Sequence, residues 1–221
     1  MPKPSANSAI IMQMNPNSPV SEAYRSLRFN IESSASGQDI KTIAITSARK
    51  GEGKTTTALN LATAFAQIGK KVLLIDADLR QPGIHLTFGM ENSRGLSSFL
   101  TGQSTVGEII RDSYVDNLSL MMAGPVPAQP TELLASKQMT ALLAELRESY
   151  DMIFIDTPSV LALTDGKILA AQCDGILLVI EYGKLKRNVA KKVKEDLLLA
   201  KTKLMGVVLN KVSYQDAEAY L

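Results

Sequence analysis

The sequence is poor in the residues that build disulfides and zinc sites. Its 221 residues include one cysteine, Cys173, and one histidine, His85. A lone cysteine excludes an intramolecular disulfide, and one cysteine with one histidine cannot supply the ligands of an ordinary zinc site. At this length the chain is nevertheless long enough to bury a sizeable core, and it fits one α/β domain better than two.

Long apolar runs are also missing. No stretch reaches the roughly 18 residues that a membrane span needs. Residues 1–15 lack the charged-then-apolar order of a signal peptide. The sequence therefore predicts a cytoplasmic protein.

Charge of one sign is not in large excess. The chain has 24 Lys and Arg against 22 Asp and Glu, a formal net charge of +2, which does not favour a strongly basic nucleic-acid binder. Eight of the basic residues lie between Lys184 and Lys203, beside two acids, so the positive charge is local. This basic run suits acidic lipid, nucleic acid, an acidic partner segment or a solvated helix face. Among the functional alternatives we favour the acidic lipid of the inner leaflet.

Apolar runs alternate with helical patterns along the chain. Most of the runs are continuously hydrophobic, which is typical of parallel strands covered on both faces. We therefore predict a three-layer α/β fold with a twisted, mostly parallel sheet covered by helices on both faces. The expected strands are 41–47, 71–78, 117–124, 151–158, 175–181 and 204–212, and the expected helices are 19–32, 55–68, 131–148, about 165–172 and about 188–201.

The chain divides into three parts by composition. Residues 1–17, with prolines among serine and asparagine, are expected to be an irregular arm, and Ser18 followed by Pro19 is a good helix start. The domain is expected over 18–212, with a tail at 213–221 that carries tyrosines.

A phosphate-loop pattern lies between the first strand and a helical pattern. Residues 48–55, ARKGEGKT, fit it with alanine in place of the usual first glycine. Gly51 and Gly53 let backbone N–H groups turn toward phosphate, and the helix beginning near Lys54 adds its positive dipole end. Lys54 is placed to reach the β and γ phosphates, and Thr55 to offer its hydroxyl to Mg²⁺. The competing interpretation is a glycine-rich turn with solvated lysines.

Two further apolar runs end in carboxylates. Asp76 and Asp78 follow one run, and Asp156 follows another. At the carboxyl ends of parallel strands beside a phosphate loop, such groups can hold Mg²⁺ through its waters or position an attacking group. Each aspartate alone is as well explained by helix capping or turn formation, so their combination with the loop carries the hypothesis.

Three motifs together resemble one known family. They are SARKGEGKTT at 47–56, LLIDADLRQP at 73–82 and IFIDTP at 153–158, and residues 22–28 add an E-x-x-R-x-x-R helix pattern. The chain resembles the bacterial tyrosine kinases of the deviant phosphate-loop superfamily, which also holds partitioning and cell-division-site ATPases. The resemblance extends from Ser18 to Asn210. The helix pattern and the LRQP segment favour the kinases within the superfamily.

The resemblance implies transfer of a phosphoryl group from ATP, with Mg²⁺, to tyrosine. By motif position Lys54 binds phosphate, Asp76 is the candidate base for the tyrosine hydroxyl, and Asp78 assists at the metal. Asn210 matches the position that contacts adenine, although a turn-forming asparagine is the alternative. The implied catalytic residues are Lys54, Asp76, Asp78 and Asp156; the metal residues are Thr55, Asp76, Asp78 and Asp156; and the ATP or ADP residues are Arg49, Lys50, Gly51, Glu52, Gly53, Lys54, Thr55, Thr56 and Asn210.

The resemblance also implies partners. These are a membrane-embedded polysaccharide co-polymerase or adaptor whose cytoplasmic tail activates the kinase, a cognate tyrosine phosphatase, and further copies of the chain in a ring; nucleic acid is not expected. The chain would then act in capsule or exopolysaccharide synthesis, peripheral at the inner face of the cell membrane through its partner. Glu22, Arg25 and Arg28 are the candidate ring residues, with a solvated helix face as the alternative.

Two positions depart from the family pattern. The partitioning ATPases carry a lysine five residues before the loop lysine, whereas this chain has Arg49, which favours the kinases. The kinases usually end in a dense tyrosine cluster, whereas this tail has only Tyr214 and Tyr220. These two are the candidate acceptors, and packing at the end of the last strand is the alternative. A second hypothesis is a nucleotide-dependent ATPase switch that positions cargo on membrane or DNA.

Overall fold

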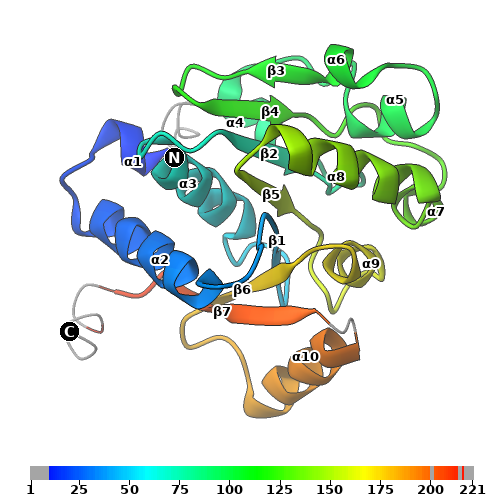
Figure 1. The fold of residues 1–221 in the computed structure, drawn as a ribbon. Coiled ribbons are helices and arrows are strands. Elements are labelled where there is room, and N and C mark those ends of the chain that lie inside the picture. The colour runs from blue at the N-terminus through cyan, green and yellow to red at the C-terminus, as the bar shows by residue number, and fades with distance from the viewer. Residues whose placement is uncertain (1–9, 200–201, 214–215, 217–221) are drawn as a thin grey trace.

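One sheet organises the molecule. The structure, a computed structural model, describes residues 10–199, 202–213 and 216. Within them the sheet has seven strands in the order β3-β4-β2-β5-β1-β6-β7, and all neighbours are parallel except β3 and β4 (Figure 1). The strands are β1 (Thr42–Ser47), β2 (Val72–Asp76), β3 (Ile110–Asp112), β4 (Leu118–Met121), β5 (Met152–Asp156), β6 (Gly175–Glu181) and β7 (Lys203–Asn210).

Helices cover both faces of the sheet, which confirms the predicted three-layer α/β fold (Figure 1). The strands β1, β2 and β5 are buried along their whole length, so each serves two cores. In β2, Val72 and Leu74 pack with Phe65 on one face, while Leu73 and Ile75 pack with Leu142 on the other. The longer helices are α2 (Pro19–Ala35) and α3 (Lys54–Ala66) on the first face and α8 (Lys137–Ser149), α9 (Asp165–Ala171) and α10 (Arg187–Leu199) on the second.

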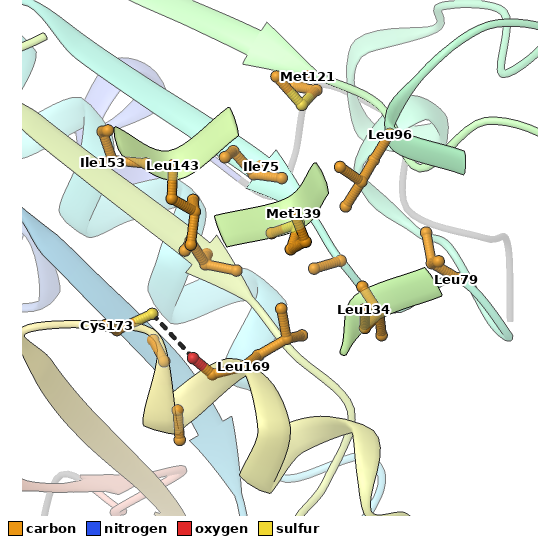
Figure 2. Close-up of a cluster of buried hydrophobic side chains, with 14 of the residues drawn as sticks. Ile75, Leu79, Leu96, Met121, Leu134, Met139, Leu143, Ile153, Leu169 and Cys173 are labelled. Carbon is orange, nitrogen blue, oxygen red and sulfur yellow. Dashed lines mark hydrogen bonds between the residues drawn. The ribbon is translucent and has the colours of Figure 1, made fainter. Parts of the chain in front are cut away.

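Figure 2 shows part of the second core. Met139 and Leu143 of α8 lie over Ile75 and Ile153 of the sheet. The Cys173 thiol donates a hydrogen bond to the Leu169 carbonyl at 3.1 Å. Burial raises the pKa of this thiol, so it is a core residue and not a nucleophile.

Short elements were not predicted from the sequence. The helix expected over 131–148 is two helices, because the chain turns at Ala135 and the Ser136 hydroxyl caps α8 by accepting from the Met139 N–H. The small edge strand β3 was also missed. The short helices are α1 (Ile11–Met14), α4 (Ile84–Phe88), α5 (Leu96–Leu100), α6 (Val106–Ile109) and α7 (Pro130–Leu134).

Residues 1–17 are expected to be irregular, but the structure has a short helix there, α1. The Met12 side chain is fully buried, and its N–H donates to Asn60 of α3 at 3.1 Å. The helix start at Ser18 is as predicted, since its side chain accepts from the Ser21 N–H and Pro19 occupies the first turn. None of the described helices is long and apolar enough to cross a membrane.

Candidate nucleotide and metal site

The phosphate loop joins β1 to α3 at the carboxyl edge of the sheet. Gly51 and Gly53 have φ of +85° and +98°, values that favour glycine. Gly53 caps α3, so the free N–H groups of the helix start at the loop. The buried Glu52 carboxylate accepts from the Arg49 N–H at 2.8 Å and tightens the turn. The local geometry is that of an anion cradle.

Asn210 at the end of β7 holds this loop from the side. Its amide Nδ2 donates to the Glu52 carbonyl at 2.9 Å. A Cβ on Gly53 would lie 1.9 Å from the same Nδ2, so only glycine fits there. Asn210 thus braces the backbone of the phosphate loop. Its contact with adenine stays a prediction.

Lys54 extends into a cluster of carboxylates. Its ammonium lies 3.2 Å from Asp78 Oδ2 and 3.7 Å from Asp156 Oδ1, with 14% of the side chain exposed. Burial alone would lower the pKa of Lys54, but the carboxylates of Asp156 and Asp78 outweigh it and the pKa is raised. Lys54 therefore carries a fixed positive charge at the mouth of the loop.

Thr55 and Asp156 are the strongest candidates for metal ligands. The Thr55 hydroxyl donates to Asp156 Oδ2 at 2.6 Å, whereas the buried Asp156 Oδ1 has no hydrogen-bond partner among the described residues. Burial raises the pKa of Asp156 to about 7. A buried carboxylate oxygen that lies 3.7 Å from the Lys54 ammonium but accepts no hydrogen bond, beside a threonine hydroxyl, fits Mg²⁺, which prefers oxygen ligands.

The metal would depend on more than protein ligands. No group of three or more His, Cys, Asp or Glu in the described ranges is arranged to hold a metal ion. Mg²⁺ in nucleotide sites commonly keeps waters and phosphate oxygens and uses one or two carboxylates. Thr55 and Asp156 meet that requirement.

Asp76 is more confined than expected. It is fully buried, and its Oδ2 accepts from the N–H groups of Gly83 and Ile84 at 2.9 and 3.0 Å. Burial raises the pKa of Asp76, while these two N–H groups act to lower it. Asp78, which is 8% exposed, lies nearer the surface and also accepts from the Gln81 N–H. The register places Asp76 opposite Asp156 on the neighbouring strand.

An ion pair between the exposed Arg80 and the buried Asp165, which sequence reasoning missed, supports the loop after β2. Arg80 Nε lies 2.8 Å from Asp165 Oδ2, and its guanidinium also donates to Thr131 at 3.0 Å. Thr131 in turn donates to Asp165 Oδ1 at 2.6 Å. The LRQP segment drew attention to Arg80, but its partners lie 51 and 85 residues away and no local pattern connects them.

The remaining predicted residues divide between the loop rim and a distant helix. Arg49, Lys50 and Thr56 are exposed at the rim of the phosphate loop. The three candidate ring residues lie on α2, which packs on α3, and not at the phosphate loop. The acceptor candidates Tyr214 and Tyr220 lie outside the described residues.

The structure separates the three ring residues. Glu22 and Arg25 pair with each other at 2.9 Å on the exposed side of α2. Arg28 instead turns inward, where it donates to the Ala64 carbonyl of α3 at 3.0 Å and lies 3.7 Å from Glu32. Arg28 therefore already links two helices of one chain.

Comparisons with known proteins show which family the chain is similar to. A domain family described as "AAA domain" matches residues 40–210. The tyrosine-protein kinase YwqD of Bacillus subtilis (strain 168) is 46% identical over 201 residues, which are 91% of this chain and 85% of that protein. The crystal structure of the chimerical protein CapA2B2 superimposes with a TM-score of 0.89 and 36% identity, covering 93% and 90% of the two chains.

The division ATPases are more distant. The cell division ATPase MinD of Pyrococcus furiosus gives a TM-score of 0.67 at 27% identity, covering 81% of this chain and 78% of that chain. Both groups share the phosphate-loop fold, but CapA2B2 matches this chain better than MinD does, with a TM-score of 0.89 against 0.67 and an identity of 36% against 27%. The phosphate loop and the carboxylates at two strand ends agree with these relatives. The chain therefore belongs to the bacterial tyrosine kinases of the MinD-like phosphate-loop class.

Proposed function

We propose that this chain is an ATP-dependent protein-tyrosine autokinase. The observation that carries the proposal is the convergence of Lys54, Thr55 and two carboxylate strand ends at one phosphate loop. Phosphoryl transfer needs mainly positioning and charge neutralisation, and this set of side chains supplies both without a covalent intermediate.

The nucleotide site divides the work among its side chains. The loop N–H groups and Lys54 hold the phosphates, while Thr55 and Asp156 hold Mg²⁺, which supplies charge neutralisation to the phosphates when bound. Arg49, Lys50 and Thr56 form the outer rim. Asn210 keeps the phosphate loop in shape and lies at its side.

The base that accepts the tyrosine proton is Asp76 or its neighbour Asp78. An unperturbed tyrosine has a pKa of about 10, so a positioned carboxylate helps to remove its proton. Asp76 is fully buried and its Oδ2 already accepts from Gly83 and Ile84, so a substrate hydroxyl needs some movement of the chain to reach Oδ1, which accepts a longer bond from the Asp78 N–H at 3.3 Å. Asp78 needs no such movement, but it also pairs with Lys54. We assign the base to Asp76, with Asp78 assisting at the metal.

Tyr214 and Tyr220 are the proposed acceptors, phosphorylated in trans within a ring. Glu22 is exposed on α2, and Arg25 is half-buried and also donates to the Pro16 carbonyl. The pair can exchange with its copy on a neighbouring chain, since exchange of partners between identical salt bridges costs little. Arg28 contributes by fixing α2 on α3. A soluble ring would then act at the inner face of the membrane through an adaptor tail, in capsule or exopolysaccharide synthesis, with a phosphatase that resets it.

The test is incubation of the purified chain with ATP and Mg²⁺, followed by detection of phosphotyrosine. We expect phosphotyrosine that disappears in the Tyr214→Phe/Tyr220→Phe variant, with or without an added adaptor-tail peptide. ATP hydrolysis stimulated by DNA or lipid, without phosphotyrosine under either condition, would instead support the ATPase switch.

A further inference from the structure

The edge strand β7 leaves apolar side chains uncovered. Leu204, Val207 and Leu209 are 40%, 49% and 49% exposed. They pair in register with Ile176, Leu178 and Ile180 of β6, which pack in the core beneath α9 and α10. All three uncovered side chains therefore lie on the α10 side of the sheet.

The helix α10 packs against β6, whereas the three apolar side chains of β7 on the same side of the sheet stay exposed. Its Val193 and Leu197 are buried in the same core as Leu178. Asp196 pairs with Lys167 of α9 at 3.0 Å, so that flank of α10 faces α9. The opposite flank borders an open hollow of about 710 Å³. Figure 1 shows α10 next to β7, the outer strand. That hollow is lined by Arg187, Asn188, Ala190, Lys191 and Lys194.

The same flank is strongly positive. Both acids of α10 are already paired with lysines, Asp196 with Lys167 and Glu195 with Lys191 at 3.9 Å. The basic side chains of this region are all exposed, and most have no acid to balance them within the described residues. They are Lys184, Lys186, Arg187, Lys191, Lys192 and Lys194.

The third feature is the free backbone of the strand. Among the described strands β7 pairs only with β6, so eight residues present one unpaired backbone edge. Such an edge is a template for another strand, with side-chain pockets at alternate positions that set specificity. A lipid surface can neutralise lysines but cannot complete a β-ladder.

We propose that the α10–β7 surface, formed by Leu204, Val207, Leu209 and the basic flank of α10, binds an acidic segment of another polypeptide in extended form. The segment adds as a strand to β7, and every second side chain of it faces α10. On that face its apolar side chains pack on Val207 and Leu209, and its carboxylates meet Lys191 and Lys194. This surface is separate from the phosphate loop, and the proposal does not depend on kinase activity.

The experiment uses a labelled eight-residue peptide, matched to the length of β7, in which every second position alternates between valine and glutamate and the remaining positions are threonine, so that one face of the strand carries both valines and glutamates. We expect fluorescence anisotropy to show saturable binding to the full chain without nucleotide, and hydrogen exchange of the β7 amides to slow. The Lys191→Glu/Lys194→Glu variant should weaken binding by about tenfold or more. The matched reversal Lys70→Glu/Lys137→Glu, at exposed lysines elsewhere, should change it less than about twofold.

Two control ligands make the proposal falsifiable. The same peptide with every backbone nitrogen methylated keeps its charge but has no N–H group to donate to β7 from either edge, so equal binding of this peptide would overturn the proposal. Vesicles of phosphatidylcholine and phosphatidylserine test the lipid alternative. Vesicle binding that is lost in Lys191→Glu/Lys194→Glu, with no binding of the peptide, would assign the surface to membrane instead.

Discussion

Two lysines in this molecule show how differently one residue type can be used. Lys54 is 14% exposed and lies between the carboxylates of Asp78 and Asp156, whereas Lys191 is 79% exposed and lies 3.9 Å from Glu195. The first charge is fixed and partly desolvated, so it can stabilise a developing charge without reorganisation. The second is hydrated and screened by salt, so it contributes little to folding. Their positions determine what each can do.

The largest contrast should come from removing each lysine in turn. Lys54→Met should reduce autophosphorylation by about 10³-fold or more, because the phosphates lose their fixed cation. Lys191→Met should stay within about twofold of the unchanged chain. Radiolabelled ATP measures both, and circular dichroism checks folding. An equal loss of autophosphorylation in the two variants would show that the two lysines do not differ in function.

The carboxylates around Lys54 sharpen the comparison. Asp76→Asn should lower the phosphorylation rate by about 10²-fold with little change in nucleotide affinity, since a base acts on the acceptor hydroxyl. Asp78→Asn should act mainly on the affinity for MgATP. Single-turnover rates and calorimetry separate the two effects. The reverse result would transfer the base to Asp78.

Ion pairs allow the same test of burial against exposure. Arg80→Ala should lower the free energy of unfolding by about 2 kcal/mol, because the buried Asp165 loses a charged partner; water screens part of this, since Arg80 is itself 38% exposed. Arg94→Ala breaks the exposed pair with Glu108 and should cost about 0–1 kcal/mol. Urea denaturation measures both. Similar losses would mean that the Arg80 pair adds no more than a surface pair.

The last test is a pH dependence. The pKa of Asp156 rises from 3.8 to about 7 in the folded chain, so the native state binds more protons than the unfolded state between these values. Its contribution to stability is therefore full below about pH 4 and is lost as pH rises through 7, on the order of 1 kcal/mol per pH unit. Denaturation of the nucleotide-free chain from pH 5 to 8 should show this decline.

A matched variant isolates this carboxyl. Asp156→Asn should flatten the slope, and saturating Mg²⁺ with ADP should oppose it, because binding of a cation favours the ionised form. A slope that is unchanged in Asp156→Asn would assign the titration to another group.

Local pattern predicted much of this molecule. Continuous apolar runs gave the parallel strands, and the Ser18-Pro19 pair gave the start of α2, because these signals depend only on neighbouring residues. The phosphate loop and the aspartates at 76, 78 and 156 were also found in sequence, since the carboxyl ends of parallel strands meet at one edge. The structure brings these residues together as expected.

What was missed depends on contacts between distant segments. Nothing local shows that Arg80 reaches Asp165, or that Arg28 turns inward to the Ala64 carbonyl instead of joining Glu22 and Arg25. The break at Ala135 and Ser136 interrupts an otherwise helical pattern with only a serine cap to mark it. The burial of Met12 depends on Asn60, 48 residues away.

The position of Asn210 has a thermodynamic consequence. This residue ends the outermost strand and at the same time braces the Glu52 carbonyl, so the strand and the phosphate loop share one hydrogen bond. Any molecule that stiffens or shifts the strand changes the energy of the loop. Linkage is reciprocal, so a nucleotide in the loop must alter the affinity of the strand for that molecule by the same factor.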